Sequence, residues 1–228
     1  TSSDSEFTLN TSLMPATSGT VFVSYWDREY VSIPKLLKEK NYYTFSMHGN
    51  NPTFWNRNNM HKKLGYDKYY AYEDDFVIDE TIGLGLSDKS FFKQAVPKIK
   101  EISETYDNFY GTLIMLTNHT PWSDIENYTD YKVDYKYKNE SGEEVNAPYL
   151  EGTTMGKYIK SVHYADEAIG QLIDDLDKEG LLEDTVIVIY GDHDAKLKKS
   201  EYARYYNYDA QTDTVLDKEG SSFLIISK

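Results

Sequence analysis

Two adjacent residues with metal-binding side chains follow an apolar run late in the chain. Asp192 and His193 come after residues 185–190, which are nearly all apolar, with only Gly191 between. A carboxylate oxygen and an imidazole nitrogen are good ligands for a divalent metal ion, and a glycine lets the chain turn sharply after a strand. An aspartate at a strand end can instead cap a helix. We favour a metal site, with Asp194 as an acid that supports the two ligands from outside.

Histidines follow the ends of three predicted strands. These are His48, His119 and His193, out of five histidines in the chain. In an open α/β sheet the ligand site lies beyond the carboxyl ends of the strands, so we expect the three imidazoles to converge in one cleft. His61 and His163 lie in helical patterns instead, and we expect them at the surface or its boundary.

The loop after His48 adds side chains suited to a phosphate ester. Arg57 can make bidentate contact with a phosphate, and Trp55 can form a wall for a polyol or sugar. The alternatives are loop packing for Trp55 and a surface ion pair for Arg57. His119 can donate a hydrogen bond to a phosphate or to a leaving oxygen, or it can be a turn residue.

Hydroxyl groups cluster in the first residues. Thr1, Ser2 and Ser3 precede or begin a capping-box pattern that runs from Ser3 to Glu6 and can start a helix. A hydroxyl at a helix N-terminus beside a divalent metal can be activated as a nucleophile. Such clusters also occur simply as helix caps.

Apolar runs alternate with amphipathic runs along the chain and would position these residues. The clearest pattern is a helix over 153–178, where apolar residues recur at steps of three and four. Further helices are predicted at 32–37 and at 87–102, the latter kinked or restarted at Pro97, and strands at 42–47, 109–116, 185–190 and 223–226. The alternation predicts an α/β fold with a mainly parallel sheet flanked by helices, and the apolar 185–190 predicts a strand buried on both faces. Residues 128–149 fit neither period and should form a loop or hairpin excursion.

Composition narrows the class of protein. The 228 residues suit a single domain over 1–228, and 38 acidic against 24 basic side chains give a net charge of -14, which disfavours nucleic acid as a partner. The absence of cysteine excludes a disulfide scaffold, a thiolate zinc site and a cysteine nucleophile. No run approaches the roughly 18 apolar residues of a membrane span. The polar start and the strand-like end suggest a domain that is incomplete at both ends, with any membrane-spanning part outside it.

Taken in order, these motifs resemble the extracellular catalytic domain of the lipoteichoic acid synthases, in the alkaline phosphatase and sulfatase superfamily. The resemblance covers nearly the whole chain, and the Phe-Trp-Asn-Arg and Gly-Asp-His pieces at this separation are highly specific. Its carriers are Thr1-Ser2-Ser3-Asp4-Ser5-Glu6-Phe7, Met47-His48-Gly49, Thr53-Phe54-Trp55-Asn56-Arg57, Leu64-Gly65-Tyr66-Asp67-Lys68, Leu86-Ser87-Asp88-Lys89-Ser90-Phe91-Phe92, Leu116-Thr117-Asn118-His119, Tyr164-Ala165-Asp166-Glu167-Ala168 and Tyr190-Gly191-Asp192-His193.

The resemblance implies roles for individual residues. Asp192 and His193 would bind a divalent metal of the manganese type, with magnesium or zinc as alternatives. The family nucleophile directly precedes Ser-Asp-Ser-Glu-Phe, which corresponds to Ser2, with Thr1 one residue earlier, and both stay candidates. The glycerol phosphate group would be held by His48, Trp55, Arg57 and His119.

The resemblance also implies an activity and a location. The family moves glycerol phosphate from phosphatidylglycerol to a growing glycerophosphate polymer in two steps, outside the membrane of Gram-positive bacteria, in a membrane-anchored or released protein. Its third metal ligand is a glutamate on a strand that precedes the first residue of this chain. Asn50 replaces an acidic family residue, and Asp194-Ala195-Lys196 replaces a Tyr-Gly continuation, so substrate preference is expected to differ. The oligomeric state is not implied.

Two other functions remain open. The same site with water as acceptor would make a phosphodiesterase, phosphonate hydrolase or sulfatase. A catalytically inactive domain that binds a cell-surface polymer is also compatible with the 22 tyrosines, whose flat rings suit sugars, and with the absent glutamate.

Overall fold

The computed structural model describes residues 1–133, 136–139, 141–146, 150–206 and 223–227. Its helices are α1 (Ser2–Thr11), α2 (Val21–Ser24), α3 (Ile33–Lys38), α4 (Arg57–Leu64), α5 (Asp88–Thr105), α6 (Thr154–Lys178) and α7 (Lys199–Tyr206), with short 3-10 turns at Phe54–Asn56 and Ile125–Asn127. Its strands are β1 (Tyr43–His48), β2 (Lys68–Ala71), β3 (Thr81–Ile82), β4 (Gly85–Leu86), β5 (Phe109–Ile114), β6 (Lys136–Lys138), β7 (Glu144–Asn146), β8 (Val186–Tyr190) and β9 (Phe223–Ser227).

The central sheet is parallel, as predicted, with strand order β2-β1-β5. Its middle strand ends at His48, which is in register with Ala71 on one side and Ile114 on the other. The carboxyl ends of the three strands therefore lie at one edge of the sheet.

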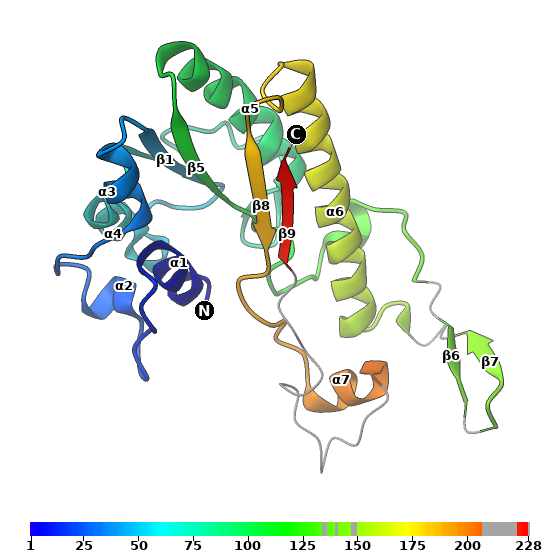
Figure 1. The fold of residues 1–228 in the computed structure, drawn as a ribbon. Helices are drawn as coiled ribbons and strands as arrows, with labels where there is room; N and C mark the ends of the chain where they lie inside the picture. The colour runs from blue at the N-terminus through cyan, green and yellow to red at the C-terminus, as the bar shows by residue number, and fades with distance from the viewer. Residues whose placement is uncertain (134–135, 140, 147–149, 207–222, 228) are drawn as a thin grey trace.

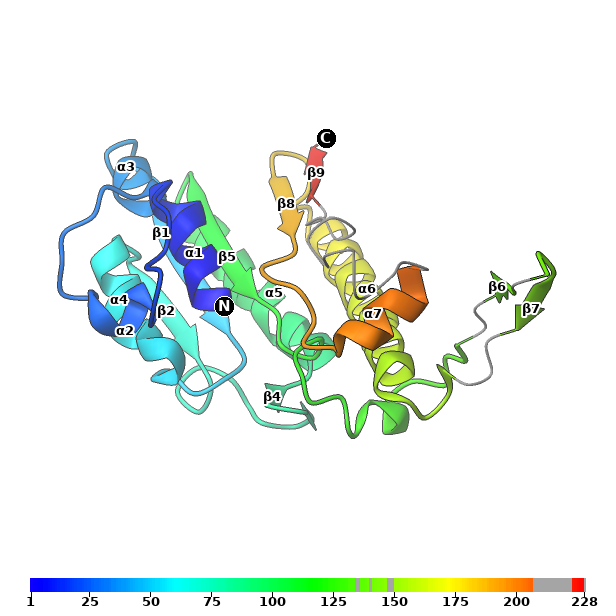
Figure 2. The same ribbon diagram turned by 90° about the horizontal axis from the view of Figure 1, so that it is seen from below.

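Helices cover both faces of this sheet (Figure 2). Because side chains alternate across a strand, Phe45 and Met47 of β1 face α5 and α6, whereas Ser46 and His48 face α1 and α4. The core under α5 and α6 contains Phe45, Met47, Phe76, Leu86, Phe91, Phe92, Ala95, Val96, Ile99, Ile102, Ala168, Leu176 and Leu182. On the opposite face, α1, α2 and α4 enclose Phe7, Val21, Phe22, Met60, Leu64 and Tyr66.

The expectation that residues 185–190 form a strand buried on both faces was wrong. In the described part of the chain β8 pairs only with β9, in antiparallel register, and no strand is hydrogen-bonded to β5 on the side away from β1. Val186 and Val188 are 64% and 45% exposed. An apolar run predicts a strand, but it does not specify which strands lie beside it. Figure 1 shows β5 and β8 near each other, in two different sheets.

The predicted helices at 32–37, 87–102 and 153–178 correspond to α3, α5 and α6, and α5 continues through Pro97. The excursion predicted at 128–149 contains the β6–β7 hairpin, as far as these residues are described. Within the described ranges, no helix combines the length and the apolar character that crossing a bilayer requires.

Candidate active site

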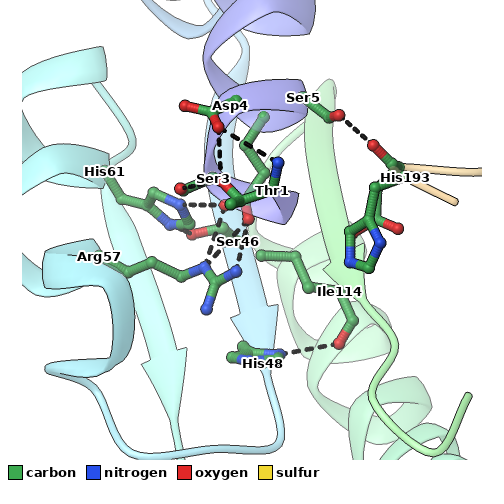
Figure 3. Close-up of polar contacts among 12 residues, drawn as sticks. Thr1, Ser3, Asp4, Ser5, Ser46, His48, Arg57, His61, Ile114 and His193 are labelled. Atoms are coloured by element: carbon green, nitrogen blue, oxygen red, sulfur yellow. Dashed lines mark hydrogen bonds and ion pairs between the residues drawn. The ribbon is translucent and has the colours of Figure 1, made fainter. Parts of the chain in front are cut away.

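His48 lies at the carboxyl end of β1, where its side chain is buried and hydrogen-bonded. Its side chain is 1% exposed, and its Nδ1 donates a hydrogen bond of 3.0 Å to the carbonyl oxygen of Ile114 (Figure 3). The other nitrogen, Nε2, is buried and has no hydrogen-bond partner among the described residues. Burial lowers the pKa of His48 to about 3. The ring is therefore neutral near pH 7, and Nε2 carries a lone pair that can accept a hydrogen bond.

His119 and His193, two of the three histidines that were expected to converge, lie beside each other. Their ring centroids are 5.8 Å apart, and the ring planes are nearly perpendicular at 85°. Nδ1 of His119 donates to the carbonyl oxygen of Thr120, and Nδ1 of His193 donates to that of Asp194 at 2.7 Å. Both rings thus keep Nε2 available for a substrate or a metal ion.

Asp192 and His193 can bind the same ion. Oδ2 of Asp192 lies 3.8 Å from Nε2 of His193. Two ligands of one ion are separated by at most about twice the metal–ligand distance of ~2.0–2.2 Å, and this pair satisfies that limit. Among the described residues there is no group of three metal-binding side chains. The pair therefore fits two positions of a divalent metal site, and a further ligand is required.

The loop that carries this pair differs from the sequence prediction in two details. Gly191 does not adopt a positive φ, and a Cβ at this position would meet nothing within 4 Å, so the turn does not depend on glycine. The backbone carbonyl of Asp194 supports His193, whereas its carboxylate makes no such contact with the ring. The expected supporting role thus belongs to the main chain.

The hydroxyl cluster lies at the N-terminus of α1, but the predicted capping box was two residues late. Thr1 is the N-cap, and its Oγ1 donates to Oδ2 of Asp4 at 2.6 Å. Ser3 is buried, and the carboxylate of Glu6 points away from the helix terminus into the protein. The local pattern allowed either start, and Glu6 had a competing partner elsewhere.

A cleft of about 470 Å³ joins the start of α1 to the end of β8. Thr1 and Asp192 both line it, whereas Ser2 is half-buried and does not. The hydroxyl of Ser5 donates to the carbonyl oxygen of Asp192, which ties the helix to the loop (Figure 3). The full lining is Thr1, Asp4, Ser5, Thr8, Leu9, Pro15, Tyr190, Gly191 and Asp192.

Arg57 is the first residue of α4 and is buried, which corrects the expectation of a loop residue or a surface ion pair. Its side chain is 1% exposed, and Nε and Nη2 donate to Glu6, at 3.1 Å and 2.6 Å. Nη1 has no partner among the described residues. Burial lowers the pKa of this guanidinium, but the charge of Glu6 and its hydrogen bonds, with smaller contributions from Tyr69 and Asp192, outweigh burial and raise the pKa. Nη1 is therefore a buried donor that has no partner among the described residues.

His61 was also misassigned, because it is 2% exposed and not a surface residue. Its Nε2 donates to Oε2 of Glu6 at 2.9 Å, and its Nδ1 accepts from Ser46 at 2.7 Å. Burial raises the pKa of Glu6, but the charge of Arg57 and the hydrogen bonds from His61 and Arg57 outweigh it and lower the pKa to about 2. The spacing of four between Arg57 and His61 puts both on one helix face, a signal that was present in the sequence.

Trp55 is half-buried and packs against the cluster enclosed by α1, α2 and α4. It has a left-handed backbone conformation, as does Asn56, and these two residues turn the chain into α4. The packing alternative is therefore part of its role, and the exposed part of the ring is still free to contact a ligand.

The sulfatase family model matches residues 1–218 of the chain. Lipoteichoic acid synthase 2 of Bacillus subtilis is 38% identical over 193 residues, which are 84% of this chain and 27% of the relative. Lipoteichoic acid synthase of Staphylococcus aureus (strain USA300) gives the same identity and coverage. The chain thus spans about a quarter of the length of these curated relatives.

Among solved structures, the lipoteichoic acid synthase LtaP from Listeria monocytogenes superposes with a TM-score of 0.79 and 28% identity, covering 98% of this chain and 52% of that one. The phosphoglycerol transferase GacH of Streptococcus pyogenes, solved with sn-glycerol-1-phosphate, gives a TM-score of 0.68 at 19% identity over 98% of this chain and 54% of that one. The latter likeness concerns the fold alone.

Proposed function

Since the chain belongs to the sulfatase family, we propose that it is the catalytic part of a metal-dependent glycerophosphotransferase. Its donor would be phosphatidylglycerol and its acceptor a lipoteichoic-acid-type polymer, on the outer face of a bacterial membrane, within a longer membrane-anchored or released protein. The observation that carries the proposal is the cleft that Thr1, at the start of α1, and Asp192, after β8, both line. The synthases to which the chain is similar support the choice of substrate.

Enzymes of the alkaline phosphatase and sulfatase superfamily use divalent metal ions. We assign Asp192 and His193 as two ligands and manganese as the ion. When bound, it would activate a hydroxyl nucleophile and neutralise charge on the transferred phosphoryl group. The third ligand would be the glutamate of the strand that the family has before the position of Thr1. Among the described residues, one edge of β5 and one edge of β8 have no strand partner, and Val186 and Val188 are exposed; both features support a strand at this location.

In this proposal, Arg57 binds the phosphate group. Its Nη1 is buried and unpartnered within the described residues, and Asp192 lies close enough to influence it electrostatically. A buried guanidinium with an unpartnered nitrogen attracts a phosphate strongly, because water does not screen its charge. Arg57 would stabilise the charge on the equatorial oxygens during transfer.

The glycerol moiety falls to His48 and Trp55. Nε2 of His48 is an acceptor in the neutral ring, so it would accept a hydrogen bond from a glycerol hydroxyl and would not donate one to phosphate. The exposed part of the Trp55 ring would pack against the carbon chain of glycerol. His119, in contact with His193, would hydrogen-bond the leaving oxygen.

The reaction then has two balanced steps. The oxygen of the nucleophilic hydroxyl, for which Thr1 is favoured over Ser2 by its position in the cleft, forms a bond to phosphorus, and the bond to the diacylglycerol oxygen breaks. The nucleophile loses a proton, and diacylglycerol takes one as it leaves. In the second step the terminal hydroxyl of the polymer attacks phosphorus and releases the side-chain oxygen, which regains a proton.

Transfer to water is the second candidate, because the side chain of Asp192 is 42% exposed and water reaches the cleft. The test uses the full-length protein, phosphatidylglycerol labelled in its glycerol headgroup, and thin-layer separation of products. Label in polymer together with release of diacylglycerol supports the transferase, and free glycerol phosphate supports the hydrolase.

Asp192→Ala should abolish either reaction. The matched control is Asp184→Ala, which makes the same change at an exposed position before the other end of β8 and should leave activity unchanged. Full activity in Asp192→Ala would refute the catalytic assignment and leave a polymer-binding domain as the better explanation.

A further inference from the structure

Glu6 is a buried carboxylate that the reaction as described above does not use. It is 4% exposed, yet it stays ionised, since the pKa of its carboxyl is lowered to about 2. A charge in the protein interior is tolerated only when it is paired and hydrogen-bonded. Glu6 lies in α1, the helix whose N-cap is Thr1, so its hydrogen-bond partners show how this helix is connected to the rest of the site.

Glu6 fixes the plane of the Arg57 guanidinium. One carboxylate accepts from both Nε and Nη2, a fork geometry that leaves neither rotation nor sliding of the guanidinium free. Of the guanidinium nitrogens only Nη1 is unpartnered within the described chain. The pairing therefore decides which edge of Arg57 is presented to a ligand.

A second set of hydrogen bonds holds Glu6 itself. Oε2 accepts from Nε2 of His61, and the hydroxyl of Ser46 donates to Nδ1 of the same ring. Ser46 is fully buried on β1, two residues before His48. The guanidinium is thus connected through the side chains of Glu6, His61 and Ser46 to β1, the middle strand of the sheet.

Glu6 also couples two parts of the site through one helix. Its neighbour Ser5 donates to the carbonyl oxygen of Asp192, and Thr1 is the N-cap of the same helix. Figure 3 shows Arg57 between the end of β1 that carries His48 and the first turn of α1. Consecutive residues of α1 therefore contact the metal-pair loop and the arginine.

We propose that Glu6 is a positioning residue for phosphoryl transfer. It orients the unpartnered Nη1 of Arg57 toward the phosphate and fixes the position of the guanidinium relative to the Thr1 hydroxyl at the start of α1. The proposal rests on the proposed function. It predicts that replacing Glu6 lowers kcat/KM only when Arg57 is present. If Glu6 were merely structural, its replacement would lower kcat/KM whichever residue stands at position 57.

The experiment measures kcat/KM for transfer from phosphatidylglycerol in the full-length protein with Glu6→Gln, Arg57→Lys and the double variant. Glu6→Gln keeps the size of the side chain but removes the charge, and it should lower kcat/KM about 10–100-fold, because misplacing a positioning group by about 1 Å can cost about 100-fold. In the Arg57→Lys background, Glu6→Gln should change kcat/KM by less than about 3-fold, because the group that it orients is gone. The control is Glu29→Gln, a carboxylate that also pairs with two cations, Lys35 and Lys63, but at the surface.

The outcomes separate the two proposals. No transfer by the unmodified protein would overturn the proposed function. Transfer by the unmodified protein with an equally active Glu6→Gln, or with losses that multiply in the double variant, would overturn the positioning role alone. If Glu6→Gln does not fold, Ser46→Ala removes the hydroxyl that fixes His61, and the same crossing with Arg57→Lys decides the question with an expected loss of about 3–10-fold.

Discussion

His48 should make the folded protein lose stability as the pH falls below 6.5. The pKa of its imidazole is lowered by burial from 6.5 to about 3, so the unfolded chain takes up a proton in a range where the folded chain does not. For a histidine with a depressed folded pKa, the stabilising contribution is complete above the unfolded pKa and is lost as the pH falls toward the folded value. The affected window is therefore pH 6.5 down to about 3.

The size of the effect follows from the proton balance. Each pH unit within the window is worth about 1.4 kcal/mol, so between pH 6.5 and pH 5 the contribution of His48 to the free energy of unfolding falls by about 2 kcal/mol. Asp88 acts in the opposite direction. Burial raises its pKa to about 6, so its contribution is complete below 3.8 and is lost as the pH rises through about 6. The wild-type slope is therefore a sum, and only a comparison with a variant isolates His48.

The variant is His48→Gln, which keeps an N–H that can donate to the carbonyl of Ile114 but does not titrate. Urea unfolding at pH 6.5 and pH 5 should show that the variant loses about 2 kcal/mol less than the wild type over this interval. An NMR titration of the His48 Hε1 resonance tests the cause directly and should find no midpoint above pH 4. Equal losses in the two proteins, or a midpoint near 6.5, would refute the reasoning.

Three further predictions concern the site and its support. Ser5→Ala removes the hydrogen bond from α1 to the loop that carries Asp192 and His193, and it should weaken manganese affinity about 10-fold in an electron-paramagnetic-resonance titration. The control Thr11→Ala removes a hydroxyl-to-carbonyl hydrogen bond at the other end of α1 and should leave the affinity unchanged, so equal affinities in the two variants would count against the coupling. Gly85→Ala puts a Cβ 2.4 Å from the carbonyl oxygen of Gly49, next to His48, and should destabilise the protein by about 1–3 kcal/mol. The control Gly170→Ala, where a Cβ would meet nothing within 4 Å, should not lower the melting temperature, and an unchanged melting temperature for Gly85→Ala would show that the backbone at Gly49 moves aside without cost. Treatment of the full-length protein with EDTA should abolish transfer and added Mn²⁺ should restore it, and transfer that persists after complete metal removal would contradict the metal assignment.

The sequence by itself determined the order of the elements and the chemistry at the strand ends. The recurrence of apolar residues at steps of three and four predicted α6 to within a residue of its start, and the strand before His48 and the strand before Asp192 were both predicted. These features are local, since they depend on side-chain periods within one helix or strand. His119 and His193, two of the three histidines expected to converge, do lie side by side, although β8 is not hydrogen-bonded into the parallel sheet from which that expectation was drawn.

Only the tertiary structure decided how the buried charges are arranged. Glu6 reads locally as part of a helix cap, yet its partner Arg57 is 51 residues away, and His61 becomes buried because that carboxylate lies opposite it. The pairing of β8 with β9 was likewise decided by a contact distant in sequence. The periodicity of a segment shows which of its faces is apolar. The free-energy cost of burying a charged side chain depends instead on the partner that the fold places beside that side chain, and this partner lies far away in the sequence.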